Sequence, residues 1–351
     1  MSFFKHSYVA GVSLALPRKR LHLADLDFGE RYITRTSHLT GIEDVCLAEP
    51  GQTVSDYAVQ AAKYMFSEME VECSTIDSVV FVSGYPDYPQ PCTAGIIQEK
   101  LGLRLNMPVF DINHLCSGFI YGIYQASLLI ESGACHNVLL CMGDFSASTT
   151  IHPKDKSARM VAGDSACAVL ISRAEDMDFP EEFSFYHDGS RARQLGLFVG
   201  GTRYPHRPGV TDVEKEDENG NIRTDENFYM DGMEIMRFAM TEVQPRVEEV
   251  LQKCGWKKDA VDVIGFHQAN EFIVKSLIRQ MKLPKEKTPI AVRHTGNLGC
   301  DSIPIALFQQ SKVVDSSEWK KCVLCGFGGG LSSAAVGLDL HRTRFLEPVI
   351  V

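Results

Sequence analysis

Three residues whose types suit nucleophilic chemistry stand far apart in the chain: Cys116, His267 and Asn297. Cys116 lies in "DINHLCSGF" (111–119), between a short apolar strand and an apolar helix that begins at Ser117. A thiol at such a helix start faces the positive end of the helix dipole, which favours the thiolate. Free cysteine is also among the most buried residue types, so a packed, unreactive thiol fits the same position.

The histidine and the asparagine occupy similar places after predicted strands. His267 and Asn270 lie in "GFHQAN" (265–270), at the end of a buried strand. Asn297 lies in "HTGNLGCDSIP" (294–304), after a glycine turn and before a helix. A hydrogen-bonded core histidine and an asparagine that caps a turn are the alternatives, so neither residue alone identifies a function.

A glycine-rich turn, "CGFGGGLSS" (325–333), follows another predicted strand. Such a turn can cradle a phosphate or present bare N–H groups to an oxyanion. It lacks the G-x-G-x-x-G pattern and the Walker lysine, so it is not a nucleotide-binding fingerprint. Cys322 and Cys325 form a C-x-x-C within the strand, but no second pair stands at zinc spacing, and we predict core packing and no metal site.

The elements that must position these residues repeat once along the chain. "IDSVVFVSG" (76–84) and "VDVIGFHQA" (261–269) each place an aspartate before a buried strand, and "HNVLLCMGD" (136–144) recurs as "KKCVLCGFG" (320–328). Strands that alternate with helical patterns predict mostly parallel sheets covered on both faces. Matched segments in the same order predict an internally duplicated α/β fold.

We therefore predict two halves, residues 1–173 with the cysteine and residues 174–351 with the histidine and the asparagine. The repeat would bring the three strand-to-loop junctions together at the strand ends. The charged stretch "TDVEKEDENGNIRTDEN" (211–227) contains Asn219-Gly220, a hairpin-turn signal. Its acidic spacing does not fit a calcium loop, and we interpret it as a solvated excursion.

Composition narrows the class of protein. The 351 residues are 44% hydrophobic and 23% charged, which is ordinary for a globular enzyme. The net charge of −10 argues against a non-specific nucleic-acid surface, and no apolar run approaches the ~20 residues of a membrane helix. "YVAGVSLAL" (8–16) is interpreted as a first strand and not a signal peptide. Eleven scattered cysteines indicate reduced thiols and a cytoplasmic location.

Together these motifs resemble the ketoacyl-ACP synthase III group of the thiolase superfamily over nearly the whole chain. The residues that carry the resemblance are "PDYPQPCTAGIIQEKLG" (86–102), "FDINHLCSGFIYG" (110–122), "VAGDSACAVL" (161–170), "MDGMEIMRFA" (230–239), "GFHQAN", "HTGNLGCDSIPIAL" (294–307) and "CGFGGG". The resemblance implies a duplicated thiolase fold, layered α-β-α-β-α, with two mixed five-stranded sheets around buried helices. It also implies a homodimer with "PDYPQPCTA" (86–94) at the interface.

The resemblance assigns chemistry to individual residues. It makes Cys116 the acyl-accepting nucleophile, and the backbone N–H groups of Cys116 and Gly329 the oxyanion hole. His267 and Asn297 would hold the thioester carbonyl of a second substrate. The implied reaction is acyl transfer from a CoA or acyl-carrier-protein (ACP) thioester to the cysteine, then decarboxylative Claisen condensation with a malonyl-type or 3-ketoacyl thioester, with no cofactor. Such a ketosynthase would serve a specialised fatty-acid, polyketide or secondary-metabolite pathway.

Other functions remain open at this point. An acyltransferase of the same fold would move the acyl group to an alcohol or amine, although Asn297 favours condensation. A thiolase would want a second catalytic cysteine, for which Cys325 lacks the context. A synthase of the HMG-CoA type would want a glutamate upstream of the nucleophile, and the nearest acid, Asp87, is not in a matching motif. A catalytically dead partner subunit would have lost the nucleophile.

The sequence departs from the family around the substrate tunnels. Arg35 and Leu39 stand where members usually carry the tryptophan and arginine that clamp the CoA adenine, and Lys156 replaces another CoA-contacting arginine. Gln90 lies where an aromatic residue often reaches the partner's acyl pocket, and Leu298 replaces a small polar residue after the asparagine. These five positions are the candidate substrate-binding residues and predict a specialised member. Arg35 and Leu39 further predict a donor carried on ACP or on a non-standard thioester more readily than on CoA.

Overall fold

The first of two large β-sheets holds the N-terminal part of the chain. The computed structural model describes residues 4–175, 177 and 179–351. In it the first sheet has the strand order β16-β1-β7-β6-β4-β5, with β17 also paired to β1. The strands are β1 (Ser7–Leu16), β4 (Ser78–Val82), β5 (Val109–Ile112), β6 (Asn137–Asp144), β7 (Ser165–Arg173), β16 (Arg344–Phe345) and β17 (Val349–Ile350). Strand β4 runs parallel to β5 and β6, whereas β7 is antiparallel to β1 and β6, so the sheet is mixed.

The second large sheet has the order β13-β14-β15-β8 and is also mixed, because β13 and β14 are parallel and the other pairs antiparallel. Its strands are β8 (Glu182–His187), β13 (Val263–Phe266), β14 (Cys322–Gly328) and β15 (Ser332–Leu338). Three short pairs complete the strands: β2 (Arg20–His22) with β3 (Asp44–Cys46), β9 (Leu195–Gly196) with β12 (Tyr229–Met230), and β10 (Lys215–Glu216) with β11 (Ile222–Arg223). The hairpin predicted at Asn219-Gly220 is confirmed by the last of these pairs.

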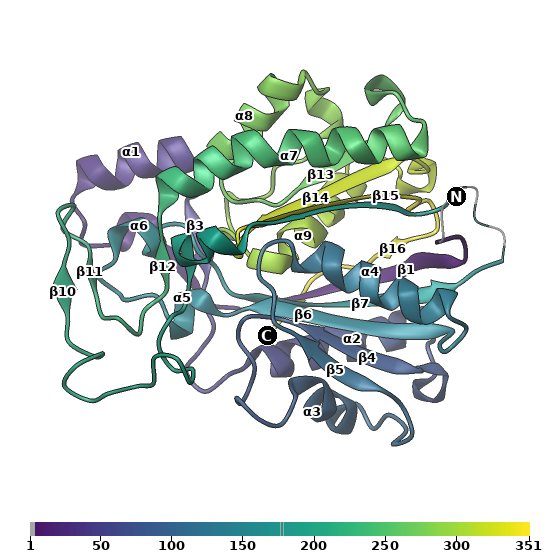
Figure 1. Ribbon diagram of the computed structural model, residues 1–351, viewed down its shortest axis with the longest axis horizontal. Coiled ribbons are helices and arrows are strands. Elements are labelled where there is room, and N and C mark those ends of the chain that lie inside the picture. The colour runs from purple at the N-terminus through teal and green to yellow at the C-terminus, as the bar shows by residue number, and fades with distance from the viewer. Residues whose placement is uncertain (1–3, 176, 178) are drawn as a thin grey trace.

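Helices form the layers above, between and below the two sheets (Figure 1). They are α1 (Glu30–Thr40), α2 (Val54–Met69), α3 (Thr93–Lys100), α4 (Gly118–Glu131), α5 (Ser146–Thr149), α6 (Lys156–Arg159), α7 (Gly232–Cys254), α8 (Glu271–Met281) and α9 (Ser302–Ser311). Helices α7 and α8 cover the second sheet, α2 and α3 cover the first, and α4 and α9 lie between the sheets. The predicted α-β-α-β-α layering is confirmed.

The buried helix α4 packs closely against the first sheet because two glycines face the strands. A Cβ on Gly118 would lie 2.7 Å from Val82 Cγ1, and one on Gly122 would lie 2.7 Å from Leu140 Cδ1. The largest apolar cluster surrounds this helix and includes Phe119, Ile123 and residues of both sheets. Because α4 is wedged between the sheets, the turn that precedes it has a fixed position. That turn carries Cys116.

The predicted strand count of five in each sheet is wrong. The first sheet gains the two-residue strands β16 and β17, which join β1 from the far end of the chain. Among the described residues, the second sheet has no strand on the outer side of β13. There the segment after α8 directs its backbone to a side chain instead: the Ala291 N–H donates to Gln268 Oε1, and the Pro289 carbonyl accepts from Gln268 Nε2. The Gln268 side chain thus makes hydrogen bonds to this segment where a neighbouring strand would otherwise pair.

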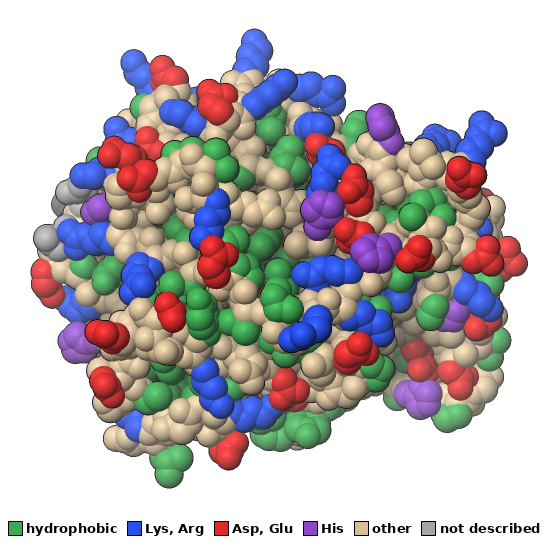
Figure 2. Space-filling view, turned by 180° about the vertical axis from the view of Figure 1, so that it is seen from behind, with side chains coloured by type: hydrophobic (Ala, Val, Ile, Leu, Met, Phe, Trp, Pro, Cys, Tyr) green, Lys and Arg blue, Asp and Glu red, His purple; other side chains and the backbone are tan. Residues whose placement is uncertain are grey.

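The surface carries both signs of charge. On the face shown in Figure 2, acidic and basic side chains are interspersed, with apolar side chains between them. Among the helices that the structure describes, none is both long and apolar enough to span a bilayer.

Candidate active site

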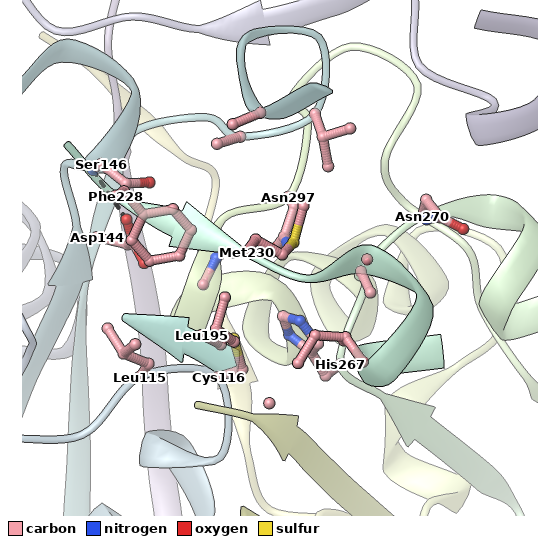
Figure 3. Close-up of a pocket in the computed structure, with 18 of the residues that line it drawn as sticks. Leu115, Cys116, Asp144, Ser146, Leu195, Phe228, Met230, His267, Asn270 and Asn297 are labelled. Atoms are coloured by element: carbon pink, nitrogen blue, oxygen red, sulfur yellow. Dashed lines mark hydrogen bonds between the residues drawn. The ribbon is translucent and has the colours of Figure 1, made fainter. Parts of the chain in front are cut away.

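Cys116 lies in the turn between β5 and α4, where the Gly118 N–H donates to the Leu115 carbonyl at 2.6 Å. The residue keeps part of its surface exposed, and it borders a cavity of about 120 Å³. Figure 3 shows this cavity with Cys116, His267 and Asn297 around it. The other labelled residues that line it are Leu115, Asp144, Ser146, Leu195, Phe228, Met230 and Asn270. The three residues predicted to converge are thus brought to one cavity.

The thiol of Cys116 is not ionised by its helix start. Burial, the larger effect, and the nearby Asp144 carboxylate together raise the pKa of the Cys116 thiol to about 12. Two backbone N–H groups, those of Gly329 and of Cys116 itself, act in the opposite direction by hydrogen bonding to the sulfur. The expectation of a thiolate is therefore corrected, because loss of water around the sulfur outweighs the helix dipole. A base must remove the proton when the sulfur attacks.

His267 follows β13 and is almost fully buried. Its Nδ1 lies 2.7 Å from Ser302 Oγ, at the start of α9, which leaves Nε2 as the ring nitrogen available to the cavity. Burial lowers the pKa of His267 to about 4, against a smaller opposing effect from the Gly299 carbonyl. The imidazole is therefore neutral at pH 7, and a neutral ring can either accept or donate one proton at Nε2.

Asn297 is held in place by its own backbone and by one glycine. Its N–H donates to the Val161 carbonyl at 2.8 Å, and its carbonyl accepts from the Gly163 N–H at 2.9 Å. The side-chain Oδ1 accepts from the Gly299 N–H at 3.0 Å. The NH₂ group is therefore the part of the amide that is free to donate into the cavity.

The glycine turn between β14 and β15 brings the Gly329 N–H to the sulfur. A Cβ on Gly328 would lie 2.7 Å from Cys116 Sγ, so only glycine leaves room for the thiol. The Ser332 hydroxyl donates to the Gly329 carbonyl at 2.7 Å, and Ser332 Oγ lies 2.7 Å from Ser117 Oγ. These contacts tie the turn to the start of α4. The predicted oxyanion donors, the N–H groups of Cys116 and Gly329, therefore both contact the sulfur.

The five predicted substrate-binding residues do not line this cavity. Leu298 is fully buried and packs in the core, so its assignment is corrected to a packing residue. Arg35 and Leu39 are exposed on α1, and Gln90 is exposed in the loop before α3. Lys156 opens α6, and its Nζ lies 3.1 Å from where a Cβ on Gly220 would stand, beneath the tip of the β10–β11 hairpin.

Sequence reasoning missed several residues of the site. Asp144 ends β6 and lines the cavity, and burial raises the pKa of its carboxyl group. Ser302 contacts the His267 ring, but in the sequence it looks like any residue at the start of a helix. Leu115 forms part of the cavity wall beside the nucleophile. Only Asp144 carried a signal, since a charged residue ends the apolar run "HNVLLCMG". Across the described residues, no group of three His, Cys, Asp or Glu side chains is placed to hold a metal ion.

Comparison with solved structures defines the class. A 3-oxoacyl-(acyl-carrier-protein) synthase III structure superposes with a TM-score of 0.90 at 31% identity and covers 95% of this chain and 100% of its own. The priming β-ketosynthase of the R1128 polyketide biosynthetic pathway superposes with a TM-score of 0.79 at 25% identity, covering 97% of both chains. The fold is thus the thiolase fold of these enzymes, as predicted.

Sequence comparison gives the family. The model of 3-oxoacyl-ACP synthase III matches residues 110–189, and the model of its C-terminal region matches residues 251–340. The β-ketoacyl-ACP synthase III of Caldanaerobacter subterraneus is 30% identical over 331 residues, which are 93% of this chain and 96% of that protein. The chain belongs to the 3-oxoacyl-ACP synthase III family. It is an acyltransferase of the condensing-enzyme type.

Proposed function

We propose that the chain forms a carbon–carbon bond in two half-reactions that share one cavity. An acyl group moves from a thioester to Cys116, and a malonyl-type or 3-ketoacyl thioester then condenses with it. The observation that carries this proposal is the convergence of the thiol, the imidazole, the asparagine amide and two backbone N–H groups on about 120 Å³. The donor set explains both half-reactions.

In the first half-reaction, the neutral thiol needs a base within reach. His267 Nε2 accepts the Cys116 proton as the sulfur attacks the thioester carbonyl carbon. The carbonyl oxygen becomes an oxyanion and accepts hydrogen bonds from the N–H groups of Cys116 and Gly329. When the tetrahedral intermediate collapses, the carrier thiolate leaves and takes the proton from Nε2. The products are acyl-Cys116 and the free carrier thiol.

In the second half-reaction, the same cavity stabilises an enolate. The carbonyl oxygen of the second thioester accepts hydrogen bonds from the Asn297 NH₂ group and from His267 Nε2–H. With a malonyl-type thioester, loss of CO₂ leaves the electron pair on the α-carbon and the negative charge on that oxygen. The α-carbon attacks the acyl carbon, and the Cys116 sulfur leaves as a thiolate that takes a proton from solvent. Two N–H donors carry the developing charge, so we propose that no metal or organic cofactor takes part.

The histidine has to present a lone pair in one step and a proton in the other. Ser302 Oγ, 2.7 Å from His267 Nδ1, suits both states because a hydroxyl group can donate or accept. When Ser302 accepts from Nδ1–H, Nε2 is the base. When the Ser302 hydroxyl turns from the Gly299 carbonyl and donates to Nδ1 instead, Nε2 carries the proton. The ring can therefore serve both steps without becoming a buried imidazolium in the resting enzyme.

The acyl donor is proposed to be carried by ACP in preference to CoA. Arg35 and Leu39 give α1 no aromatic-and-arginine pair with which to clamp an adenine, and the β10–β11 hairpin lies against Lys156. The compartment is proposed to be the cytoplasm, which the eleven free cysteines support.

A homodimer is proposed from the free edge of the first sheet. Strand β5 is the outermost strand, so one side of its backbone has no ladder partner in the described chain. Phe110 and Ile112 of this strand and Tyr121 and Tyr124 of α4 are only partly buried, and Tyr88 is 58% exposed. An apolar sheet edge of this kind is normally covered, and a second copy that pairs through β5 would cover it.

Intact-protein mass spectrometry tests the proposed function. The wild-type protein is incubated with matched acyl-ACP and acyl-CoA panels, and the acyl mass on Cys116 is followed beside product formation from a malonyl thioester. We expect a mass increase that Cys116→Ala abolishes, and faster loading from ACP. Equal loading from acetyl-CoA would contradict the donor preference. A loaded enzyme that passes its acyl group to an alcohol or amine, with no decarboxylation, would make the acyltransferase the better assignment.

A further inference from the structure

Leu115, the residue before the nucleophile, fills a space that two glycines leave open. A Cβ on Gly84, in the loop after β4, would lie 2.5 Å from Leu115 Cδ2. A Cβ on Gly329, in the turn after β14, would lie 2.8 Å from Leu115 Cδ1. Both methyl groups of one leucine are therefore seated against bare backbone from two separate loops. The side chain is fixed by these contacts and has little space to move away from the cavity.

Leu115 stands on the side of the sulfur that an acyl chain must use. In Figure 3, Leu115 lies to one side of Cys116 and His267 to the other. The His267 and Asn297 side is taken by the second thioester in the proposed reaction. The N–H groups of Cys116 and Gly329 fix the acyl carbonyl oxygen, and Leu115 is bonded to the first and packed against the second. The carbon chain that continues from that carbonyl therefore meets Leu115.

A second leucine also lines the cavity. Leu195 of β9 is 6% exposed and lines the same cavity, and its Cδ2 lies 3.7 Å from where a Cβ on Gly328 would stand. Phe228 lies beyond Leu195 in the view of Figure 3. An acyl group on Cys116 would therefore have both leucines beside it, and Leu115 is the one packed against glycines of two loops.

We propose that Leu115 limits the length of the acyl group that Cys116 accepts, so that the enzyme takes short acyl groups. This inference rests on the proposed loading of Cys116. Each methylene group that a hydrophobic pocket cannot accommodate typically changes discrimination by about 10- to 200-fold. A donor that reaches the position of the Leu115 methyl groups should therefore load much more slowly than a shorter one.

The experiment compares two substitutions with opposite expected effects. Leu115→Ala removes the side-chain atoms beyond Cβ and should raise loading of longer acyl groups at least 10-fold relative to acetyl. Gly84→Ala should push Leu115 Cδ2 toward the sulfur and shift the preference toward the shortest donors. Straight-chain acyl-ACP thioesters of increasing length are the probes, and the acyl mass on the intact protein is the readout. Leu103→Ala is the control. It truncates a buried leucine near α3 that does not line the cavity, so the length profile should stay unchanged.

The outcomes separate the two proposals. An unchanged length profile in both Leu115→Ala and Gly84→Ala, with loading intact, would overturn the role of Leu115 alone. If neither the wild-type protein nor any variant gained acyl mass, the proposed loading of Cys116 would instead be wrong. If Leu115→Ala does not fold by circular dichroism, Leu115→Val, which shortens the side chain by one methylene group, should show the same shift at smaller size, and its failure to do so would count against the proposal.

Discussion

The Gly299 N–H donates to Asn297 Oδ1 at 3.0 Å, and this single contact decides which end of the amide faces the cavity. The same glycine accepts a hydrogen bond at its carbonyl from the Ser302 hydroxyl at 2.8 Å, and Ser302 in turn contacts His267. Gly299 therefore orients both donors of the second half-reaction. It has a φ of 54° and its Cα faces the Asp144 carboxyl group, so a side chain could not be accommodated there.

The Asn297→Ala variant should separate the two half-reactions. It keeps the thiol, the base and the oxyanion N–H groups, so acyl loading should be close to wild type. It loses one donor to the enolate, so condensation should fall by about 10²–10³, or roughly 2.7–4 kcal/mol. Acyl mass and product formation are measured on the same sample. If this variant formed product at the wild-type rate, the assignment as a condensing enzyme would be wrong.

Alkylation of Cys116 should rise with pH and show no plateau near neutrality. Burial and Asp144 raise the pKa of the Cys116 thiol to about 12, so the thiolate fraction should increase about tenfold per pH unit between pH 6 and 9. Iodoacetamide labelling followed by peptide mass mapping measures the rate. The exposed Cys92 in the same molecule is the internal reference. A rate that levels off near pH 7 would indicate a thiolate activated by the helix start.

His267 should make the protein less stable in acid. Burial lowers its pKa to about 4, against about 6.5 in an unfolded chain. The unfolded state therefore binds more protons in this window, and the stability present above pH 6.5 is lost progressively as the pH falls to 4. Between pH 7 and pH 5 the loss should be about 2 kcal/mol. The urea midpoints of wild type and His267→Gln at the two pH values test this, and an equal drop in both proteins would contradict it.

Gly328→Ala should block loading without unfolding the protein. The added Cβ would lie 2.7 Å from Cys116 Sγ, well inside contact distance, so the sulfur must move from the two N–H donors. We expect the acylation rate to fall by about 10² or more, the effect of losing an oxyanion donor. Gly189→Ala is the matched control, because a Cβ there meets no atom within 4 Å. Normal loading by the Gly328 variant would show that the sulfur has more freedom than its contacts indicate.

Substitutions on β5 should produce a monomer. Phe110→Lys places a charge on the partly buried face of the edge strand, where a second copy is proposed to pair. Light scattering at micromolar concentration should give a dimer mass for the wild type and a monomer mass for the variant. Val313→Lys, at a residue 82% exposed after α9, should stay dimeric. A monomeric wild-type protein would remove the homodimer and with it the role of Gln90 in a partner's acyl pocket.

The meeting of three residues was predictable because Cys116 and His267 each follow a strand whose apolar pattern is local, and the layered fold was predictable from the resemblance to a known family. Asn297 follows an irregular segment and not a strand, so local patterns alone did not place it. The division into residues 1–173 and 174–351 stays a prediction. The strands β16 and β17 were not predictable, since two-residue strands have no pattern of their own.

The surroundings of the site depend on contacts between distant segments, which local sequence patterns do not place. Lys156 lies beneath a hairpin that arrives some sixty residues later in the chain, as is usual for contacts that local patterns do not encode. Leu298 looked like a substrate contact by its position next to Asn297, yet its side chain points into the core. The thiol's ionisation was misjudged for a related reason: a helix dipole can be read from sequence, but the loss of water around a side chain depends on everything packed against it.

The pairing of β1 with β16 and β17 has a consequence for how the protein is made. Gly11 pairs with Arg344 and Ala15 pairs with Val349. Both edges of β1 are therefore covered only after almost the last described residues have been synthesised. A ribosome that has completed the segment with Cys116 has not yet made the strands that finish the sheet beneath it, nor the turn that supplies the Gly329 N–H. The nascent chain should therefore lack the Gly329 oxyanion donor, and with it the means to accept an acyl group at Cys116, until the second sheet has been made.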